Sequence, residues 1–336
     1  MSVVRDVRDG TSALHAFLDH HLPGRAVVAN EWAAALKAVP RHGERLRWDR
    51  EVVGRALEVR IGLDVADRPG YWDDLAFLSA AECRTLLMAA GFTHPELDDG
   101  EPVCSDPLHR CWQRASRAPS DAPWDEALRA CLDAAELAAM LHESRHTLSV
   151  EECRNSCRLL RSIWSSAGWV ARRSRALDGL RELWSRYLTF GRDRLVKLGS
   201  RVVLEPVLAI GYARADMVIG HTLVEVKVQL EPWDHAGQSL DQLLAYLLLD
   251  RWNSLGLDAV ALYAGWEAAA LVADVDAVLT AVTSGPTPDL QDLRSDFHDA
   301  MRETLGWGES LYLGRLFDTG GTFTTTSDQG RSGGRD

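Results

Sequence analysis

The first half of the chain has the apolar spacing of helices. Apolar residues recur there every three or four positions, for example at Leu128, Cys131 and Leu132, which is the period of a helix with one buried face. Prolines interrupt the pattern at intervals and indicate where helices end. We therefore expect a mainly helical N-terminal domain over residues 1–173.

The apolar pattern changes near residue 201. A helical segment over residues 174–198 is followed by three short runs rich in Val, Ile and Leu, as in successive strands. A strongly apolar helix comes next, and two further strands surround a turn at Gly265. This order predicts a mixed α/β core over residues 174–285. The strands are expected at residues 202–210, 213–219, 222–229, 259–263 and 268–272, and the apolar helix at 234–255.

Two segments follow the predicted core. The spacing of apolar residues predicts a helix over residues 290–306, within a C-terminal segment that spans 286–317. Residues 318–336 are rich in Gly, Ser and Thr, a composition that is typical of a disordered tail.

Composition narrows the class of protein. The chain has 336 residues and a formal net charge of −12, which excludes a polycationic nucleic-acid coat. Apolar residues make up 46% of the chain, yet no apolar run reaches the roughly 18 residues that a membrane helix needs. The first residues alternate charged and apolar side chains and lack the apolar centre of a signal peptide. We therefore expect a cytoplasmic protein that does not associate with a membrane and keeps its six cysteines reduced.

A predicted hairpin carries the candidate chemistry. Gly220 and His221 separate two of the predicted strands and suit a two-residue loop. The pairing that such a loop sets places Asp216 opposite Glu225. Lys227 shares the face of Glu225, because side chains along a strand alternate with a period of two. Opposed like charges are costly, and a bound divalent cation with oxygen ligands would compensate for them, so the hairpin predicts a Mg²⁺ or Mn²⁺ site.

The apolar helix after the hairpin has one polar stripe. Gln238, Gln242 and Tyr246 are spaced by four, so they share a face of a helix whose other positions are mostly leucine. That face should lie against something polar.

These residues together resemble the PD-(D/E)XK nuclease superfamily. The Asp-x8-Glu-Val-Lys pattern from Asp216 to Lys227, followed by a Gln-x3-Tyr pair that ends at Tyr246, is similar to the branch with a QxxxY helix, as in RecB-type nuclease domains. The resemblance covers about residues 174–272, roughly a third of the chain. It implies a restriction-endonuclease-like mixed sheet flanked by helices. Ala215 stands where the family's name has proline.

The resemblance implies how the strand residues act. Asp216, Glu225 and the main-chain carbonyl of Val226 would bind Mg²⁺ or Mn²⁺. Lys227 would orient the attacking water and stabilise the charge that develops on the phosphate.

The resemblance also implies roles for helical residues. Gln242 and Tyr246 would hold the nucleic acid or support the site, and Glu182 is the candidate for an additional acid on the first helix. The implied activity is metal-dependent hydrolysis of phosphodiester bonds in DNA, or in RNA, in prokaryotic defence or DNA repair. A helicase or ATPase partner and a homo-oligomer are both compatible with that activity.

Basic residues are concentrated just before the hairpin. Residues 151–201 contain twelve basic and five acidic side chains and so carry a local net charge of +7. A basic surface beside an acidic metal site suits a phosphodiester backbone, although a solvated helical face would have the same composition. The residues expected to bind nucleic acid are Arg172, Arg173, Arg175, Arg186 and Gln238.

A zinc-protease motif competes with this reading. His142-Glu143-x-x-His146 would place two imidazoles on one helix face for Zn²⁺, with Glu143 as general base. The charged Arg145 inside the motif and a capping box shortly after it disfavour that arrangement. A zinc metalloprotease is therefore the alternative function, and a non-catalytic nucleic-acid-binding subunit of a larger complex is a second alternative.

A second group of metal-binding residue types lies earlier in the chain. Cys104, His109 and Cys111 could form part of a structural zinc site, but their spacing is not that of a standard zinc knuckle. Whether they bind zinc stays open.

Overall fold

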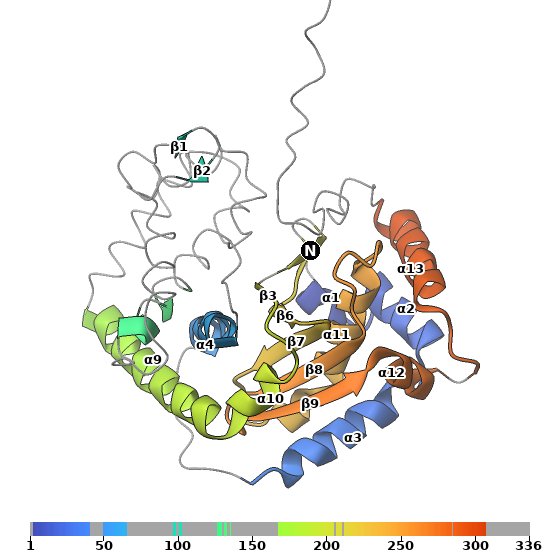
Figure 1. The fold of residues 1–336 in the computed structure, drawn as a ribbon. Helices are drawn as coiled ribbons and strands as arrows, with labels where there is room; N and C mark the ends of the chain where they lie inside the picture. Colours follow the sequence, from blue (N-terminus) through green and yellow to red (C-terminus); the bar gives the residue numbers. More distant parts are fainter. Residues whose placement is uncertain are drawn as a thin grey trace, which may run out of the picture.

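The structure is mixed α/β, and its centre is a five-stranded mixed sheet flanked by helices, as predicted (Figure 1). The computed structural model describes residues 3–40, 50–65, 167–204, 206–209, 212–283 and 285–306, with short stretches between 97 and 135. The strands of the main sheet are β3 (Val202–Leu204), β6 (Met217–Ile219), β7 (Thr222–Lys227), β8 (Ala259–Ala264) and β9 (Ala269–Asp274). They lie in the order β3-β6-β7-β8-β9, in which β7 and β8 run parallel and the other neighbours antiparallel.

The predicted strand over residues 202–210 is divided in two. Pro206 lacks the N–H that a strand interior needs, and its carbonyl accepts a hydrogen bond from the Ala215 amide at 3.1 Å. β4 (Val207–Ala209) therefore pairs with β5 (Ala213–Arg214) outside the main sheet. A further short pair joins β1 (Leu97–Asp98) to β2 (Glu101–Pro102).

β6 and β7 form the predicted hairpin in the predicted register. Ile219 pairs with Thr222, and two more pairs follow in the same register, so Gly220 and His221 make a two-residue loop. Gly220 has a φ of 62°, in the left-handed region that glycine enters without steric cost. The register that positions the candidate site is thus confirmed.

The connection from β7 to β8 contains the helix with the polar stripe. A 3₁₀ turn, η3 (Pro232–His235), leads into α11 (Ala236–Leu249), inside the predicted range. Two parallel neighbours require such a crossover. The leucines of α11 are buried, so the helix packs closely on the sheet.

Two helices follow the sheet. α12 (Val275–Val282) is not among the predicted elements, and Asp274 caps it by accepting a hydrogen bond from the Ala277 amide at 3.0 Å. α13 (Leu290–Leu305) confirms the predicted C-terminal helix. It begins at an Asp289 cap and ends at Gly306, which has a φ of 67°.

Helices cover both faces of the sheet, and each face has its own core. Helices described before the sheet include α1 (Val3–Arg8), α2 (Ala13–His21), α3 (Arg25–Ala38), α4 (Arg50–Val65) and α9 (Ala167–Arg186). One core joins α4 and α9 to the sheet through Leu57, Trp184 and Val226. The other joins α1–α3 to the sheet and to α11–α13, so the first helices share a core with the predicted α/β unit (Figure 1). In the described ranges, no helix is long and apolar enough to cross a bilayer.

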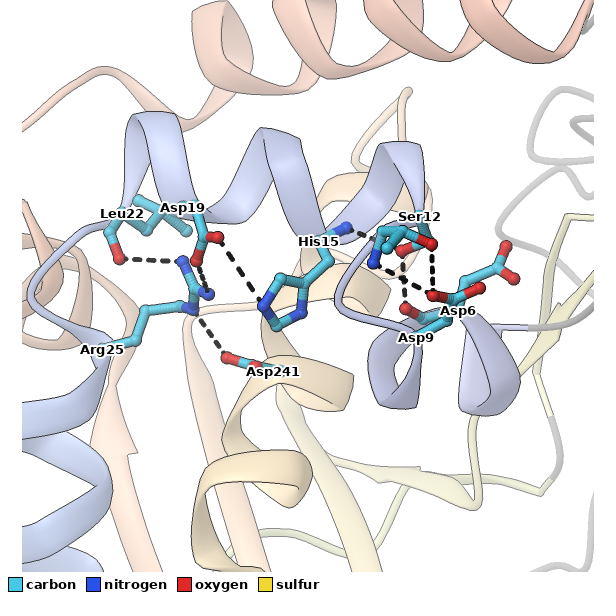
Figure 2. Close-up of polar contacts among 9 residues, drawn as sticks. Asp6, Asp9, Ser12, His15, Asp19, Leu22, Arg25 and Asp241 are labelled. Carbon is cyan, nitrogen blue, oxygen red and sulfur yellow. Dashed lines mark hydrogen bonds and ion pairs between the residues drawn. The ribbon is translucent and has the colours of Figure 1, made fainter.

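A buried arginine links the first helices to α11. Arg25 donates from Nε to Asp241 at 2.7 Å and from Nη2 to Asp19 at 2.8 Å, and its Nη1 bonds the Leu22 carbonyl (Figure 2). Burial raises the pKa of Asp241 even though the Arg25 charge opposes the shift. The start of the Gln/Tyr helix is therefore held against α2 and α3.

The helix predicted over residues 174–198 is interrupted. α9 continues into a π-helix, η2 (Tyr187–Gly191), and then into α10 (Arg192–Val196). Asp64 on α4 accepts hydrogen bonds from the Tyr187 hydroxyl at 2.8 Å and from Arg192 Nε at 2.7 Å. These bonds fix α4 against the π-helical turn.

Candidate active site

Glu225 and Lys227 lie together on one face of β7, as their alternation predicts. The ammonium of Lys227 donates to Oε1 of Glu225. Glu225 is only 1% exposed, whereas the Lys227 side chain keeps 19% of its surface accessible. The carboxylate is therefore buried behind a lysine that reaches solvent.

Asp216 is held against the same strand. Its Oδ2 accepts a hydrogen bond from the Val226 amide at 2.7 Å. Asp216 directly precedes β6, so continuation of the hairpin register places it beside Glu225. Of the two carboxylates that the sequence pairs across the hairpin, Glu225 lies in β7 and Asp216 lies in the bend that leads into β6.

The polar stripe of α11 continues from Lys227. Lys227 Nζ donates to Gln242 Oε1 at 3.2 Å, and Gln242 Nε2 donates to the Tyr246 hydroxyl at 2.7 Å. An unbroken chain of contacts thus joins Glu225, Lys227, Gln242 and Tyr246. All four are positions that the family pattern singles out.

The charges of the site set its protonation. Burial lowers the pKa of Lys227, but the charges of Glu225 and Asp216 outweigh burial and hold that pKa above its usual value. Burial, followed by the same two carboxylates, raises the pKa of Tyr246 well above its usual value. At neutral pH the site therefore presents an ammonium and a neutral phenol.

Glu58 on α4 adds negative charge near the site and is not among the residues selected from sequence. Its charge contributes to raising the pKa values of both Lys227 and Tyr246, so it acts on the site from a helix more than 150 residues away in the chain. Glu182, the acid selected from sequence, accepts a hydrogen bond from Arg186 Nε at 2.9 Å on α9.

A pocket opens beside Lys227 and Gln242. Its walls come from α1, from the end of β7 and from the first turns of α11. Gln238 lines it, as the four-residue stripe predicts, whereas nothing in the sequence pattern indicated that α1 would contribute. The lining residues are Val4, Val7, Arg8, Lys227, Gln229, His235, Gln238, Ser239 and Gln242.

The donor set suits a hard divalent cation. Oε2 of Glu225 is buried and has no hydrogen-bond partner among the described residues, and an unsatisfied buried carboxylate oxygen is costly unless something binds it. Asp216 and the Val226 carbonyl are the neighbouring oxygen donors, and Mg²⁺ and Mn²⁺ prefer oxygen ligands. Within the described ranges, no group of three or more His, Cys, Asp or Glu side chains is arranged to hold a metal.

Known proteins do not resolve the identity of this site. Comparisons with protein-family models, with curated proteins and with solved structures find no match for the chain. The geometry and chemistry of the site are therefore the basis for its function.

The arginines expected to bind nucleic acid lie in different environments. Arg172 and Arg175 are exposed on the first turns of α9, and Arg173 is half-buried. Arg186 is only 4% exposed, and its Nη1 donates to the Trp266 carbonyl at 2.8 Å. The guanidinium of Arg186 therefore has protein partners in the core, while Arg172 and Arg175 are exposed.

The competing metal motifs lie outside the described residues. His142, Glu143 and His146 belong to that part of the chain, as do Cys104, His109 and Cys111. The zinc protease and the structural zinc site therefore stay predictions from sequence.

Proposed function

We propose that this protein is a Mg²⁺- or Mn²⁺-dependent nuclease with a restriction-endonuclease-like core. The observation that carries the proposal is the chain of contacts from Glu225 through Lys227 to Gln242, with Asp216 bonded to the same strand. A buried carboxylate, an adjacent ammonium and an amide in a pocket suit attack on a phosphodiester.

Each residue has a role that its position supports. Asp216, Glu225 and the main-chain carbonyl of Val226 would hold the ion. When bound, the ion lowers the pKa of a water molecule and neutralises charge on the phosphate. Lys227 places its ammonium where negative charge develops, and Gln242, itself bonded to Tyr246, orients that ammonium.

The topology supports the same proposal. The antiparallel hairpin β6–β7, the α11 crossover and the parallel neighbour β8 follow the order of elements in the PD-(D/E)XK core that the sequence resembles. Sheet order alone does not decide function, so the proposal depends mainly on the side chains of the site. The proposed substrate is DNA, with RNA as the alternative, and the proposed location is the cytoplasm. A helicase or ATPase is the proposed partner, in defence or DNA repair.

Metal removal is the direct test of the proposed activity. Purified full-length protein is expected to cleave linear, circular or single-stranded DNA or RNA with Mg²⁺ or Mn²⁺ and to lose this activity in EDTA, because the ion would supply both the activation of water and the neutralisation of charge on the phosphate. Gel electrophoresis of labelled substrates measures the products. Cleavage that persists in EDTA contradicts the proposal, and binding without any cleavage favours the non-catalytic subunit.

A second prediction concerns the three arginines near the start of α9. Reversal of Arg172, Arg173 and Arg175 to glutamate should weaken binding to unrelated DNA sequences about equally, because phosphate contacts carry no base information. If about five phosphates are neutralised, log Kd should vary with log salt with a slope of about 4–5 for duplex DNA, and the triple variant should lower it by about 2–3.

Fluorescence anisotropy over a salt series measures this slope. Arg302→Glu on α13, where the arginine is 61% exposed, is a control for charge reversal away from α9. A triple variant with the parent slope would place the nucleic acid on another surface.

A further inference from the structure

Arg8 lies at the pocket that contains Lys227 and Gln242. It is in the last turn of α1 and is exposed, and it lines the same pocket as those two residues. No hydrogen bond or ion pair engages its guanidinium within the described part of the chain. A cation from the N-terminus is thus brought to a site built about 220 residues later.

The backbone that carries Arg8 is firmly fixed. Asp6 is buried and accepts a hydrogen bond from the Tyr212 hydroxyl at 2.9 Å, and the Ser12 hydroxyl bonds the Asp6 carbonyl at 2.6 Å (Figure 2). The Val3 amide also donates to the Tyr212 carbonyl at 3.1 Å. A guanidinium on an anchored turn loses less freedom on binding than one on a loose terminus.

The neighbouring acid is engaged elsewhere. Asp9 accepts hydrogen bonds from the Thr11 hydroxyl at 2.6 Å and from the Thr11 amide at 3.0 Å. These two bonds and the charge of Arg5 lower the pKa of Asp9. Asp9 is therefore oriented towards Thr11, and the Arg8 charge is available for an anion.

The pocket between Arg8 and Lys227 is polar and incompletely satisfied. Gln229 lines it, and its Oε1 is buried without a hydrogen-bond partner among the described residues. Gln238 and His235 add further polar groups to the lining. A polar ligand that carries negative charge next to a hydrogen-bond donor would suit these walls.

We propose that Arg8 binds the phosphate that neighbours the scissile phosphate in the nucleic-acid strand. The inference rests on the proposed nuclease function, in which Lys227 serves the scissile phosphate itself. Arg8 is a second cation on another wall of the same pocket, so it can pair with the next phosphate of a polyanionic strand. Its planar guanidinium can donate two hydrogen bonds to the oxygens of that phosphate. The substrate is then a polynucleotide that crosses the pocket lined by α1 and α11, rather than an isolated phosphodiester.

A methylphosphonate scan tests this contact. Full-length protein without divalent metal is titrated with oligonucleotides in which one phosphate at a time is made neutral, and binding is followed by fluorescence anisotropy. Wild type is expected to lose about tenfold in affinity at the phosphate next to the scissile one, the worth of a charged hydrogen-bonded pair, in addition to losses at phosphates bound by other cations. Arg8→Ala should lose a similar factor on unmodified DNA and lose nothing more at that position, and Arg8→Lys should recover part of the loss.

Lys37→Ala, which removes an exposed cation of α3 that does not line the pocket, should bind like wild type. The Arg8 inference fails, and the nuclease proposal stands, if Arg8→Ala binds DNA as tightly as wild type. The same holds if Arg8→Ala loses affinity at every neutralised phosphate at which wild type loses affinity. If wild type binds oligonucleotides but never cleaves them with Mg²⁺ or Mn²⁺, the nuclease function is contradicted. The methylphosphonate scan then still decides whether Arg8 binds a phosphate. Failure of wild type to bind any oligonucleotide overturns both.

Discussion

Replacement of Glu225 or Lys227 by glutamine is expected to reduce cleavage by about a thousandfold or more. Each substitution keeps the size of the side chain approximately. Glu225→Gln removes a charged ligand of the proposed ion and Lys227→Gln removes the cation at the phosphate, and each of these contributes several kcal/mol to transition-state stabilisation. Initial rates on a labelled DNA substrate measure the loss. Circular dichroism should show that both variants remain folded.

Two controls define where the active site lies. Glu231→Gln removes an exposed carboxylate shortly after β7. This variant should leave the rate within about twofold of wild type, because water and salt screen an exposed charge. His142→Ala should also retain activity. If His142→Ala instead abolishes cleavage in a folded protein, the catalytic residues belong to the His-Glu-x-x-His motif and not to β7.

Gly220→Ala is expected to destabilise the protein by about 3 kcal/mol. A left-handed φ costs a non-glycine residue about 1–2 kcal/mol, and the added Cβ would lie 2.2 Å from the Leu198 carbonyl oxygen. Relief of that clash would move the loop and the hydrogen bond from the Gly220 amide to the Arg201 carbonyl. Urea unfolding followed by circular dichroism measures the change, and Tm should fall by about 6–12 °C.

Two other glycines separate strain from steric clash. Gly306 has a φ of 67° and nothing within 4 Å of its Cβ position, so Gly306→Ala should cost only about 1 kcal/mol. Gly285 has open space and no positive φ, and its replacement by alanine should change the stability by less than about 0.5 kcal/mol. Equal losses at all three positions would contradict the steric explanation for Gly220.

The parts of the fold that local patterns determine were predictable. The period of two in β7 and the Gly-containing two-residue loop decide the register by themselves, so the juxtaposition of Asp216, Glu225 and Lys227 follows from about a dozen consecutive residues. The spacing of Gln242 and Tyr246 likewise decides that they share a helix face.

The parts that tertiary packing determines were not predictable. Glu58 and Arg8 reach the site because α4 and α1 dock on opposite faces of the sheet, and neither helix carries a local signal of where it docks. The sequence pattern placed α1–α3 with an N-terminal helical domain, whereas these helices share a core with α11–α13. α12 was missed because it is only eight residues long and directly follows a strand, although its buried residues Val275, Val278, Leu279 and Val282 have helical spacing.

The pairing of Arg25 with Asp241 has a consequence for synthesis of the chain. These residues are 216 positions apart, and a ribosome that adds roughly 5–20 residues per second needs about 10–40 s to cover that interval. Throughout it, Leu18 and Leu36 lack the α11–α13 partners that bury them in the finished protein. The nascent N-terminus therefore keeps apolar surface uncovered by its native partners until most of the polypeptide has been synthesised.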